Sequence, residues 1–381
     1  MIAEPDLGAI VRARSETFLR NRPSTVAQRK ALRAIGACRT PALGGQRQHC
    51  DHCGHEHIQW HSCRNRSCPR CGAAARARWL DARRTELLPV PYFHVVFTVP
   101  EVLNLIALHA PRVFYGLLFR AAGHALVDVA NSRLQIQPGC LSVLHTWGQT
   151  LTLHPHIHCV VPGGGFSRHG RQWRSTAKST FFLPVKVLSR RFRSLLIRFL
   201  REAWRGGTLQ LPERVLADSV ALDLLLARAA ATDWIVYCKP PFGGPQQVLA
   251  YLANYTHRIA ISNSRIVSFD GERVDFRYRD YAHDNTEKFL SLDVDEFLRR
   301  FLLHVLPPRL VRIRYYGFLA NRIRTRSIEL ARQLIDGRFL PPVPLPTIDN
   351  HLCPHCGAGT LRVVGLVPPE RPPPAHEDSL S

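Results

Sequence analysis

Cysteine spacing near the N-terminus constrains the fold of this chain more than any other sequence feature. Six of the eleven cysteines lie between positions 38 and 71, in a segment with too few large apolar residues to fold around a core. Cys50 and Cys53 form one CxxC pair, and Cys68 and Cys71 form another after fourteen intervening residues. This spacing predicts a four-thiolate zinc site that replaces the missing core and contributes on the order of 10 kcal/mol to folding.

Two cysteines of the same segment, Cys38 and Cys63, remain outside this predicted site. With the neighbouring histidines they are numerous enough to bind a second ion, although each histidine taken singly is expected to face solvent or phosphates. Clustering of this kind in a cytosolic protein favours metal over disulfides. The histidines of the segment are His49, His52, His55, His57 and His61.

The other five cysteines are expected to have separate roles. Cys353 and Cys356 make half of a further metal site whose partners are not local. Either His351 and His355 close that site, or the pair is a remnant. The last three cysteines are expected to be small buried hydrophobes in strands. They are Cys140, Cys159 and Cys238.

The charge of the chain indicates the kind of partner. The sequence has 51 Lys and Arg residues against 29 Asp and Glu residues, a formal net charge of +22. About eight positive charges suffice for solubility, so the excess predicts a polyanion, of which nucleic acid is the commonest. The sequence has no uninterrupted run of 18 apolar residues, and its first twelve residues include acidic ones. We therefore expect a cytoplasmic protein without a membrane partner.

Hydrophobic periodicity divides the chain into helices and strands. Ser24 is the expected cap of the first helix, Asp270-Gly271 marks a hairpin turn, and Gly163 to Gly165 are expected to form a flexible exit from a strand. Helices are expected at 24–37, 73–88, 100–132, 189–204, 245–257, 294–304 and 322–335, and strands at 92–99, 141–147, 150–161, 234–238, 259–280 and 311–315.

A histidine-rich strand is the first candidate for catalytic chemistry. The run LHPHIHCVV places His154, His156 and His158 at alternate positions, so their imidazoles project from one face of the sheet. A single strand histidine is usually structural. Three on one face followed by a buried run favour a metal site.

Two tyrosines form the second candidate. Tyr251 and Tyr255 lie four residues apart on an expected helix, so both phenols emerge from one face. Such a pair alone more often reflects packing. Beside a metal it fits a tyrosine nucleophile, because a phenol with a pKa of about 10 needs help to attack a phosphodiester. A metal held by His156 and His158 would polarise the phosphate, and attack would leave a 5′-phosphotyrosine link.

These motifs resemble a known family. The runs HPHIHC with the following PGGG, YLANYTHR, SCRNRSCPRCG, RRFLLHVLP and RIRYYGFLANRIR are similar to those of rolling-circle insertion-sequence transposases. These are the two-tyrosine members of the HUH (His-hydrophobic-His) endonuclease superfamily, in the insertion-sequence family numbered ninety-one. The resemblance covers most of residues 38–326, and the zinc, HUH and tyrosine elements occur in the family's order.

The resemblance implies an α+β fold and a domain order. A zinc-binding DNA-recognition domain is expected at 1–90, followed by an HUH-type catalytic domain at 91–340 with a central antiparallel sheet flanked by helices. A Pro-rich linker with a CxxC pair and a disordered tail is expected at 341–381. The implied partners are single-stranded DNA at transposon ends and target DNA, without a small-molecule cofactor.

The resemblance also assigns roles to single residues. His156 and His158 match the HUH pair, and Tyr251 and Tyr255 match the paired nucleophiles. The superfamily adds a third polar metal ligand, for which Gln149 is the first choice, with His154 and His257 as competitors. Imidazole ligands by themselves suggest zinc or another transition metal, whereas Mg²⁺ or Mn²⁺ follows from the resemblance.

Arginine-rich runs are the expected DNA contacts. Their phosphate contacts would make binding strongly dependent on salt, and Tyr315, Tyr316 and Phe318 could stack unpaired bases. For any one of these residues, a solvated arginine face and a buried aromatic are equally good interpretations. The arginines are Arg64, Arg66, Arg70, Arg312, Arg314, Arg322, Arg324 and Arg326.

Two other functions fit the same residues. A relaxase or replication initiator would use the same site chemistry, and a zinc-dependent DNA-binding protein without catalysis would leave the histidines and tyrosines structural. Capture of labelled DNA on the protein distinguishes the enzymes from the binding protein.

Overall fold

The computed structural model describes residues 5–170, 172–176, 182–239, 247–248, 251, 259–281, 283–335 and 352–370. The chain forms two compact units. The first unit comprises residues 1–75, 259–305 and 344–381, and the second comprises residues 76–258 and 306–343. The fold is α+β with a central antiparallel sheet, as expected from the sequence.

The second unit is built on a five-stranded antiparallel sheet with strand order β13-β5-β6-β3-β9. Its strands are rich in β-branched and aromatic residues, which favour extended backbone. Along β6, Ile157, Cys159 and Val161 are buried on one face, and the histidines alternate with them on the other. The strands are β3 (Tyr92–Thr98), β5 (Gly139–Trp147), β6 (Leu153–Pro162), β9 (Val236–Lys239) and β13 (Ile313–Gly317).

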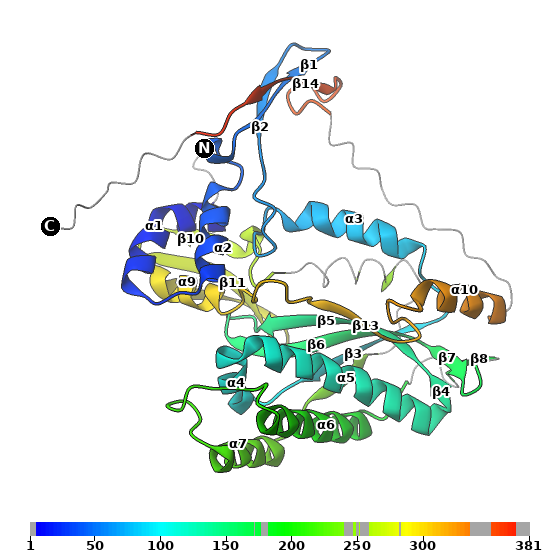
Figure 1. The fold of residues 1–381 in the computed structure, drawn as a ribbon. Helices are drawn as coiled ribbons and strands as arrows, with labels where there is room; N and C mark the ends of the chain where they lie inside the picture. The colour runs from blue at the N-terminus through cyan, green and yellow to red at the C-terminus, as the bar shows by residue number, and fades with distance from the viewer. Residues whose placement is uncertain are drawn as a thin grey trace. The chain divides into compact units, whose positions relative to one another are not determined.

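Helices pack on the apolar face of this sheet and form the main core (Figure 1). Phe97 of β3 contacts Phe192 of α6 with ring centroids 4.9 Å apart, and Phe93 stacks on Phe182 at 5.0 Å. Burying such side chains contributes roughly 1.5–3 kcal/mol each, so this face supplies much of the stability of the second unit. The helices are α4 (Asn104–His109), α5 (Pro111–Leu134), α6 (Val185–Arg205) and α7 (Ser219–Ala231).

Helix α5 is long and apolar enough to cross a membrane by length and composition. Most of its apolar residues are buried in the core beside the sheet and α6. This is the ordinary environment of a core helix, so its length and composition are weak evidence for a membrane span.

The other face of the sheet is packed by α3 (Gly72–Arg84) and α10 (Arg324–Leu334), as Figure 1 shows. Leu80 and Ile328 pack there with Leu141 and Val143 of β5. Because these apolar side chains share the face with the histidines, the sheet has a second, smaller core next to the imidazoles.

The glycine run after β6 is not the flexible exit that we expected. It forms β7 (Gly164–Ser167), which pairs with β4 (Ile136–Gln137) and β8 (Trp173–Ser175). A Cβ atom at Gly165 would lie 2.4 Å from the carbonyl oxygen of Gln137, so this position requires glycine because another strand passes so close.

The first unit contains two small sheets. The strands β10, β11 and β12 form one antiparallel sheet, which packs on α9 through Phe276 and Phe297, with ring centroids 5.9 Å apart. Helix α1 joins this group through an ion pair of 3.1 Å between Arg14 and Asp295. The elements are α1 (Leu7–Asn21), α2 (Val26–Ala37), η1 (Pro41–Leu43), η3 (Asn263–Arg265), β10 (Ile266–Phe269), β11 (Arg273–Asp280), β12 (Thr286–Asp293) and α9 (Val294–Leu302).

The second small sheet joins the two ends of the chain. Strand β1 (Gly45–Cys50) pairs with β2 (Glu56–Trp60) on one side and with β14 (Leu361–Val367) on the other. The segment predicted at 341–381 therefore includes a strand between the CxxC pair and the expected disordered tail, and this strand belongs to the first unit. The expected linker at 341–346 and the residues after 370 lie outside the described residues.

Most of the elements expected from the sequence are present, and some of them begin or end at other residues. The N-cap of α2 is Thr25 rather than Ser24, because the Thr25 hydroxyl accepts the amide of Gln28 in a capping box. Helices α1 and α7 and strands β1, β2, β4, β8, β12 and β14 were not expected. Most of the helix expected at 245–257 lies outside the described residues. Residues 247–248, which the structure describes, are helical.

Candidate active site and metal centres

Three histidines of neighbouring strands come together on the polar face of the central sheet. His156 and His158 lie on β6, and His145 lies directly opposite His156 on β5. One ring nitrogen from each residue lies within 4.8 Å of the others. We call these three residues the imidazole cluster. Opposed and alternate strand positions share one face, so the sheet itself aims the three rings at a common point.

Hydrogen bonding selects the nitrogen that His156 offers to a cation. Its Nδ1 lies 2.7 Å from the carbonyl oxygen of His154, which can only accept. Nδ1 therefore carries the proton, so Nε2 is the ring nitrogen that bears the lone pair. His145 and His158 are buried, which limits the orientations of their rings.

The phenol of Tyr251 lies beside this cluster. Its hydroxyl forms a hydrogen bond with Nε2 of His94 and lies 3.3 Å from Nδ1 of His158. Nε2 of His94 also lies 2.9 Å from Nδ1 of His158. Burial, with the nearby positive charges of Lys239 and His156, lowers the pKa of His94 to about 3, so this imidazole is neutral at physiological pH. A neutral ring can hold the phenol without repelling a cation at the cluster.

One of the predicted third ligands is placed differently from expectation, because Gln149 lies in the turn between β5 and β6 instead of on a strand. His154 lies on β6 as predicted, but it is exposed at the end of that strand and is not part of the imidazole cluster. His145 occupies the position that we had assigned to Gln149, and we missed it. The strand alternation that identified His156 could have found it, if the register had been counted back across the Gly148 turn. His257 and the second nucleophile, Tyr255, lie outside the described residues.

Four cysteines of the first unit form a compact group, which we call the N-terminal thiol cluster: Cys38, Cys63, Cys68 and Cys71. The Sγ atom of Cys71 lies 3.5 Å from that of Cys38 and 3.6 Å from that of Cys63. Tetrahedral zinc with bonds of about 2.3 Å separates its sulfur ligands by about 3.8 Å, so the group can hold such an ion. Burial raises the pKa of Cys38 to about 11, so this thiol needs a cation to ionise at neutral pH.

The remaining CxxC pair does not join this group, which corrects the predicted pairing. Cys50 and Cys53 lie instead with Cys353 and Cys356, and we call these four residues the split thiol cluster. His351 lies outside the described residues, and His355 stacks on His55 with ring centroids 4.9 Å apart. Backbone N–H groups of Gly359 and then Ala358 lower the pKa of Cys356 to about 6.

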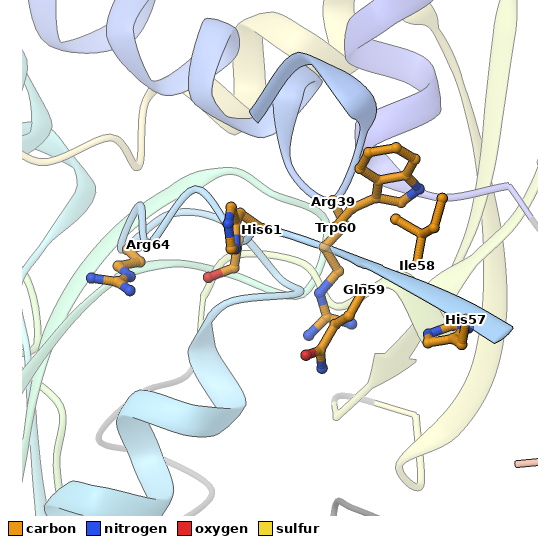
Figure 2. Close-up of a pocket in the computed structure, with 8 residues that line it drawn as sticks. Arg39, His57, Ile58, Gln59, Trp60, His61 and Arg64 are labelled. Atoms are coloured by element: carbon orange, nitrogen blue, oxygen red, sulfur yellow. The ribbon is translucent and has the colours of Figure 1, made fainter. Parts of the chain in front are cut away.

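A hollow of about 620 Å³ opens beside β2 and the loop that follows it (Figure 2). Its lining combines two guanidinium groups with imidazoles and an indole, a mixture that can contact phosphates and stack on bases. Arg39 and Arg64 are exposed and both have positive φ angles, 56° and 52°. We call this the β2 hollow, and its lining residues are Arg39, His57, Ile58, Gln59, Trp60, His61, Ser62 and Arg64.

Comparison with known proteins identifies the family. Residues 139–327 match a family model described as "Putative transposase", and residues 10–99 match one described as "Transposase zinc-binding domain". The chain is 49% identical over 336 residues to the "Putative transposase y4qJ" of Sinorhizobium fredii, covering 87% of this chain and 84% of that protein. This chain belongs to the IS91 family of transposases.

A second relative agrees with this assignment. The transposase is 27% identical over 344 residues to the "Transposase for insertion sequence element IS801" of Pseudomonas savastanoi pv. phaseolicola, covering 84% of this chain and 80% of that one. No solved structure matches the chain significantly. The zinc-binding family model spans the whole N-terminal thiol cluster, so the transposase contains a zinc-binding domain.

The arginines expected at DNA divide into exposed and packed ones. Arg64 lines the β2 hollow, and Arg322 is exposed before α10. Arg70 is structural, because it pairs with Asp6 and donates to the carbonyl oxygen of Cys38 at 3.2 Å. The guanidinium of half-buried Arg314 lies over the Phe119 ring at 4.5 Å from its centroid, so it packs against the core of the transposase. Arg66 is exposed, and Arg312 is partly buried next to β13.

The aromatics expected to stack on bases have structural positions. Phe318 is only 4% exposed, and Tyr316 packs so closely on α5 that a Cβ at Gly123 would lie 2.6 Å from its ring. The hydroxyl of Tyr315 accepts from Arg83 at 3.0 Å. The alternative interpretation, in which these rings are core residues of the transposase, is the one that the structure supports.

Proposed function

We propose that this transposase nicks and transfers single DNA strands at the ends of its insertion sequence, by rolling-circle transposition through a 5′-phosphotyrosine link. The proposal rests chiefly on the position of Tyr251, whose hydroxyl lies 3.3 Å from a nitrogen of His158 in the imidazole cluster. A phosphate at the cluster would be within reach of this phenol, which is the geometry that a tyrosine nucleophile needs.

The imidazole cluster is the proposed site of the catalytic ion. His145, His156 and His158 would hold it, with His145 in place of the third ligand expected from the sequence. A set of three nitrogens suits a transition metal, so Mn²⁺ fits these residues better than Mg²⁺. When bound, the ion would polarise the scissile phosphate and offset the charge that develops on it.

The residues of the chain would carry the covalent steps. The Tyr251 oxygen attacks the phosphorus, the bond from phosphorus to the 3′ oxygen breaks, and that oxygen takes up a proton as the phenol loses one. The products are a 5′-phosphotyrosine link and a free 3′-hydroxyl. A second 3′-hydroxyl can attack the link, which rejoins the strand and restores the phenol. Tyr255 would serve a second strand in the same way.

His94 acts as a positioning residue in this proposal. The Nε2 atom of its buried neutral ring contacts both the phenol of Tyr251 and Nδ1 of His158. Because both contacts use Nε2, moving His94 would shift Tyr251 relative to the cluster. We expect its loss to reduce nicking without removing the metal.

Single-stranded DNA is the proposed partner, and the β2 hollow is one place where it would bind. Arg39 and Arg64 are suited to phosphates, and the partly exposed indole of Trp60 is suited to a base. The net charge of +22 would draw DNA to the protein and make binding strongly dependent on salt. The expected location is the cytoplasm, on the nucleoid when DNA is bound.

Trapping the covalent link tests the proposal. The protein is incubated with labelled single-stranded oligonucleotides from the ends of its element and Mn²⁺, then denatured in detergent. We expect label on the protein, and its loss when Tyr251 and Tyr255 are both changed to Phe. Tyr237→Phe is the control, because Tyr237 is 51% exposed on β9 of the same unit.

Other outcomes separate the alternatives. Cleavage without a surviving adduct would indicate a hydrolase, and binding of the element ends without cleavage would indicate a DNA-binding protein. A relaxase or replication initiator would also give the adduct, but the family match favours transposition.

A further inference from the structure

We propose that the split thiol cluster binds a zinc ion of its own, so that the zinc-binding domain is assembled from both ends of the chain. The matching zinc-binding family model ends at residue 99 and cannot include Cys353 or Cys356. The inference concerns a metal site in addition to the proposed catalysis.

Sulfur geometry is the first support. The Sγ atoms of Cys50 and Cys356 lie 3.8 Å apart, as do those of Cys53 and Cys353. Tetrahedral zinc with sulfur bonds of about 2.3 Å requires a separation of about 3.8 Å between ligands, whereas a disulfide requires about 2.0 Å. All four sulfurs lie within 4.8 Å of one another, as ligands of one ion must.

The two CxxC turns have matching backbones. Gly54 follows Cys53 with φ of 73°, and Gly357 follows Cys356 with φ of 66°. In each turn the glycine amide donates to the carbonyl oxygen of the first cysteine, at 3.2 Å in the first and 2.9 Å in the second. Only glycine adopts this conformation readily, so both turns are built to point two sulfurs the same way.

Amides also point at the sulfurs. The amide of Cys53 lies 3.5 Å from Sγ of Cys50, and the amide of Gly359 lies 3.3 Å from Sγ of Cys356. Hydrogen bonds of this kind favour the thiolate, which is the form that binds a metal. A Cβ at Gly359 would lie 2.5 Å from Sγ of Cys50, so the C-terminal segment approaches this sulfur as closely as a glycine allows.

Apolar burial around the split thiol cluster is small. The buried core here consists of Cys50, Cys353 and Leu361. On β14 the side chains of Val364 and Leu366 are 54% and 77% exposed. Strand pairing with so little apolar burial does not hold two distant segments together. A metal ion bound by the four cysteines would supply the missing stabilisation.

The site has a consequence for DNA binding, which rests on the proposed function. Strand β1 is held by β14 on one side and carries β2 on the other, and β2 supplies residues of the β2 hollow. The ion between Cys50, Cys53 and the C-terminal pair would fix the end of this hairpin. Loss of the C-terminal cysteines should therefore loosen the hollow although they do not line it.

Zinc content of full-length protein tests the inference. The double variant Cys353→Ser/Cys356→Ser should bind one zinc equivalent fewer than the unsubstituted protein, by elemental analysis. Cys38→Ser/Cys63→Ser should also lose one equivalent, and the two losses should add. Cys238→Ser is the matched control, because this thiol belongs to neither cluster, and it should lose none. Because zinc losses are counted relative to the unsubstituted protein, an ion bound at the imidazole cluster does not affect the result.

Two results would overturn the inference. One is an unchanged zinc content in Cys353→Ser/Cys356→Ser, and the other is iron in place of zinc in protein made with both metals available. If this variant fails to fold, Co²⁺ replacement in the unsubstituted protein decides instead: the thiolate charge-transfer band should correspond to two four-sulfur sites, and one site would refute the proposal. Tyr251→Phe should keep every equivalent, so a failed adduct experiment does not affect this test.

Discussion

The imidazole cluster and the two thiol clusters are held in place by different forces. On the face of the central sheet opposite the imidazole cluster, helices cover the strands, and Phe97 of β3 is fully buried there with Phe192 and Phe199 of α6. Around the split thiol cluster, the buried residues are two cysteines and Leu361. The central sheet would therefore fold without an ion, whereas the sheet of β1, β2 and β14 would depend on the zinc that we propose for the split thiol cluster.

This difference separates two uses of a metal in one chain. An ion at the imidazole cluster would be a reagent placed on a finished scaffold, and an ion at either thiol cluster would be part of the scaffold. Mutations and chelators should therefore act on activity in one region and on folding in the other.

Removal of metal should have the largest effect, because the two regions are expected to respond to it in opposite ways. Treating the protein with a strong chelator at neutral pH should abolish hydrogen-exchange protection in β1, β2 and β14, because each structural zinc contributes on the order of 10 kcal/mol. Protection in β3 and β6 should persist. Loss of protection in all five strands together would contradict the distinction.

The stability of the second unit should depend on tight packing instead of on a metal ion. Gly317 has φ of 62°, and a Cβ there would lie 1.7 Å from the carbonyl oxygen of Pro138. Gly317→Ala should destabilise the second unit by roughly 4 kcal/mol and leave the zinc content unchanged. Gly170→Ala is the control, because Gly170 has φ of 68° but no atom within 4 Å of its Cβ position. It should cost only about 1 kcal/mol by urea denaturation, and equal costs would refute the steric argument.

Local patterns explain how much of this could be predicted from the sequence. Alternation along β6 placed His156 and His158 on one face, and helical and strand periodicity located most elements of the second unit. These features depend on neighbours a few residues apart. His145 was missed because its place depends on the register of β5 against β6, which periodicity alone does not provide.

The thiol clusters show more clearly which contacts the sequence alone does not predict. Spacing alone paired Cys50 and Cys53 with the nearest CxxC pair, whereas the structure brings them to a segment about 300 residues later. Cysteines are chemically equivalent, so ligand spacing does not reveal which pairs share an ion. The pairing of β1 with β14 decides this, and nothing in the local sequence of either strand predicts it.

Loss of the proposed third imidazole ligand should affect activity and leave stability nearly unchanged. His145→Ala should reduce metal-dependent nicking about 100-fold, or about 2.7 kcal/mol, because one of three ligands is lost. Stability should change little, since the scaffold does not need this ion. Gln149→Ala tests the ligand expected from the sequence. Should Gln149→Ala lower metal affinity while His145→Ala does not, the original expectation would be right and His145 structural.

The smallest predicted effect concerns α9, a part of the first unit that is held without metal. Glu296 bonds to Arg299 at 2.6 and 2.8 Å and to Arg300 at 2.6 Å, and these bonds lower its pKa to about 2. Since the folded pKa lies below the ordinary value of 4.5, the stabilisation is complete above that pH and is lost as the pH falls towards 2.

Glu296→Gln should therefore lower the opening free energy of α9 amides by about 1 kcal/mol at pH 7, measured by native-state hydrogen exchange. Zinc content should stay the same, because α9 packs through Phe297 and not through cysteines. Glu329→Gln removes the same charge from an exposed position on α10 and should have no effect on α9. A parallel loss of zinc in the Glu296 variant would mean that the apolar and metal-held parts of the first unit unfold together.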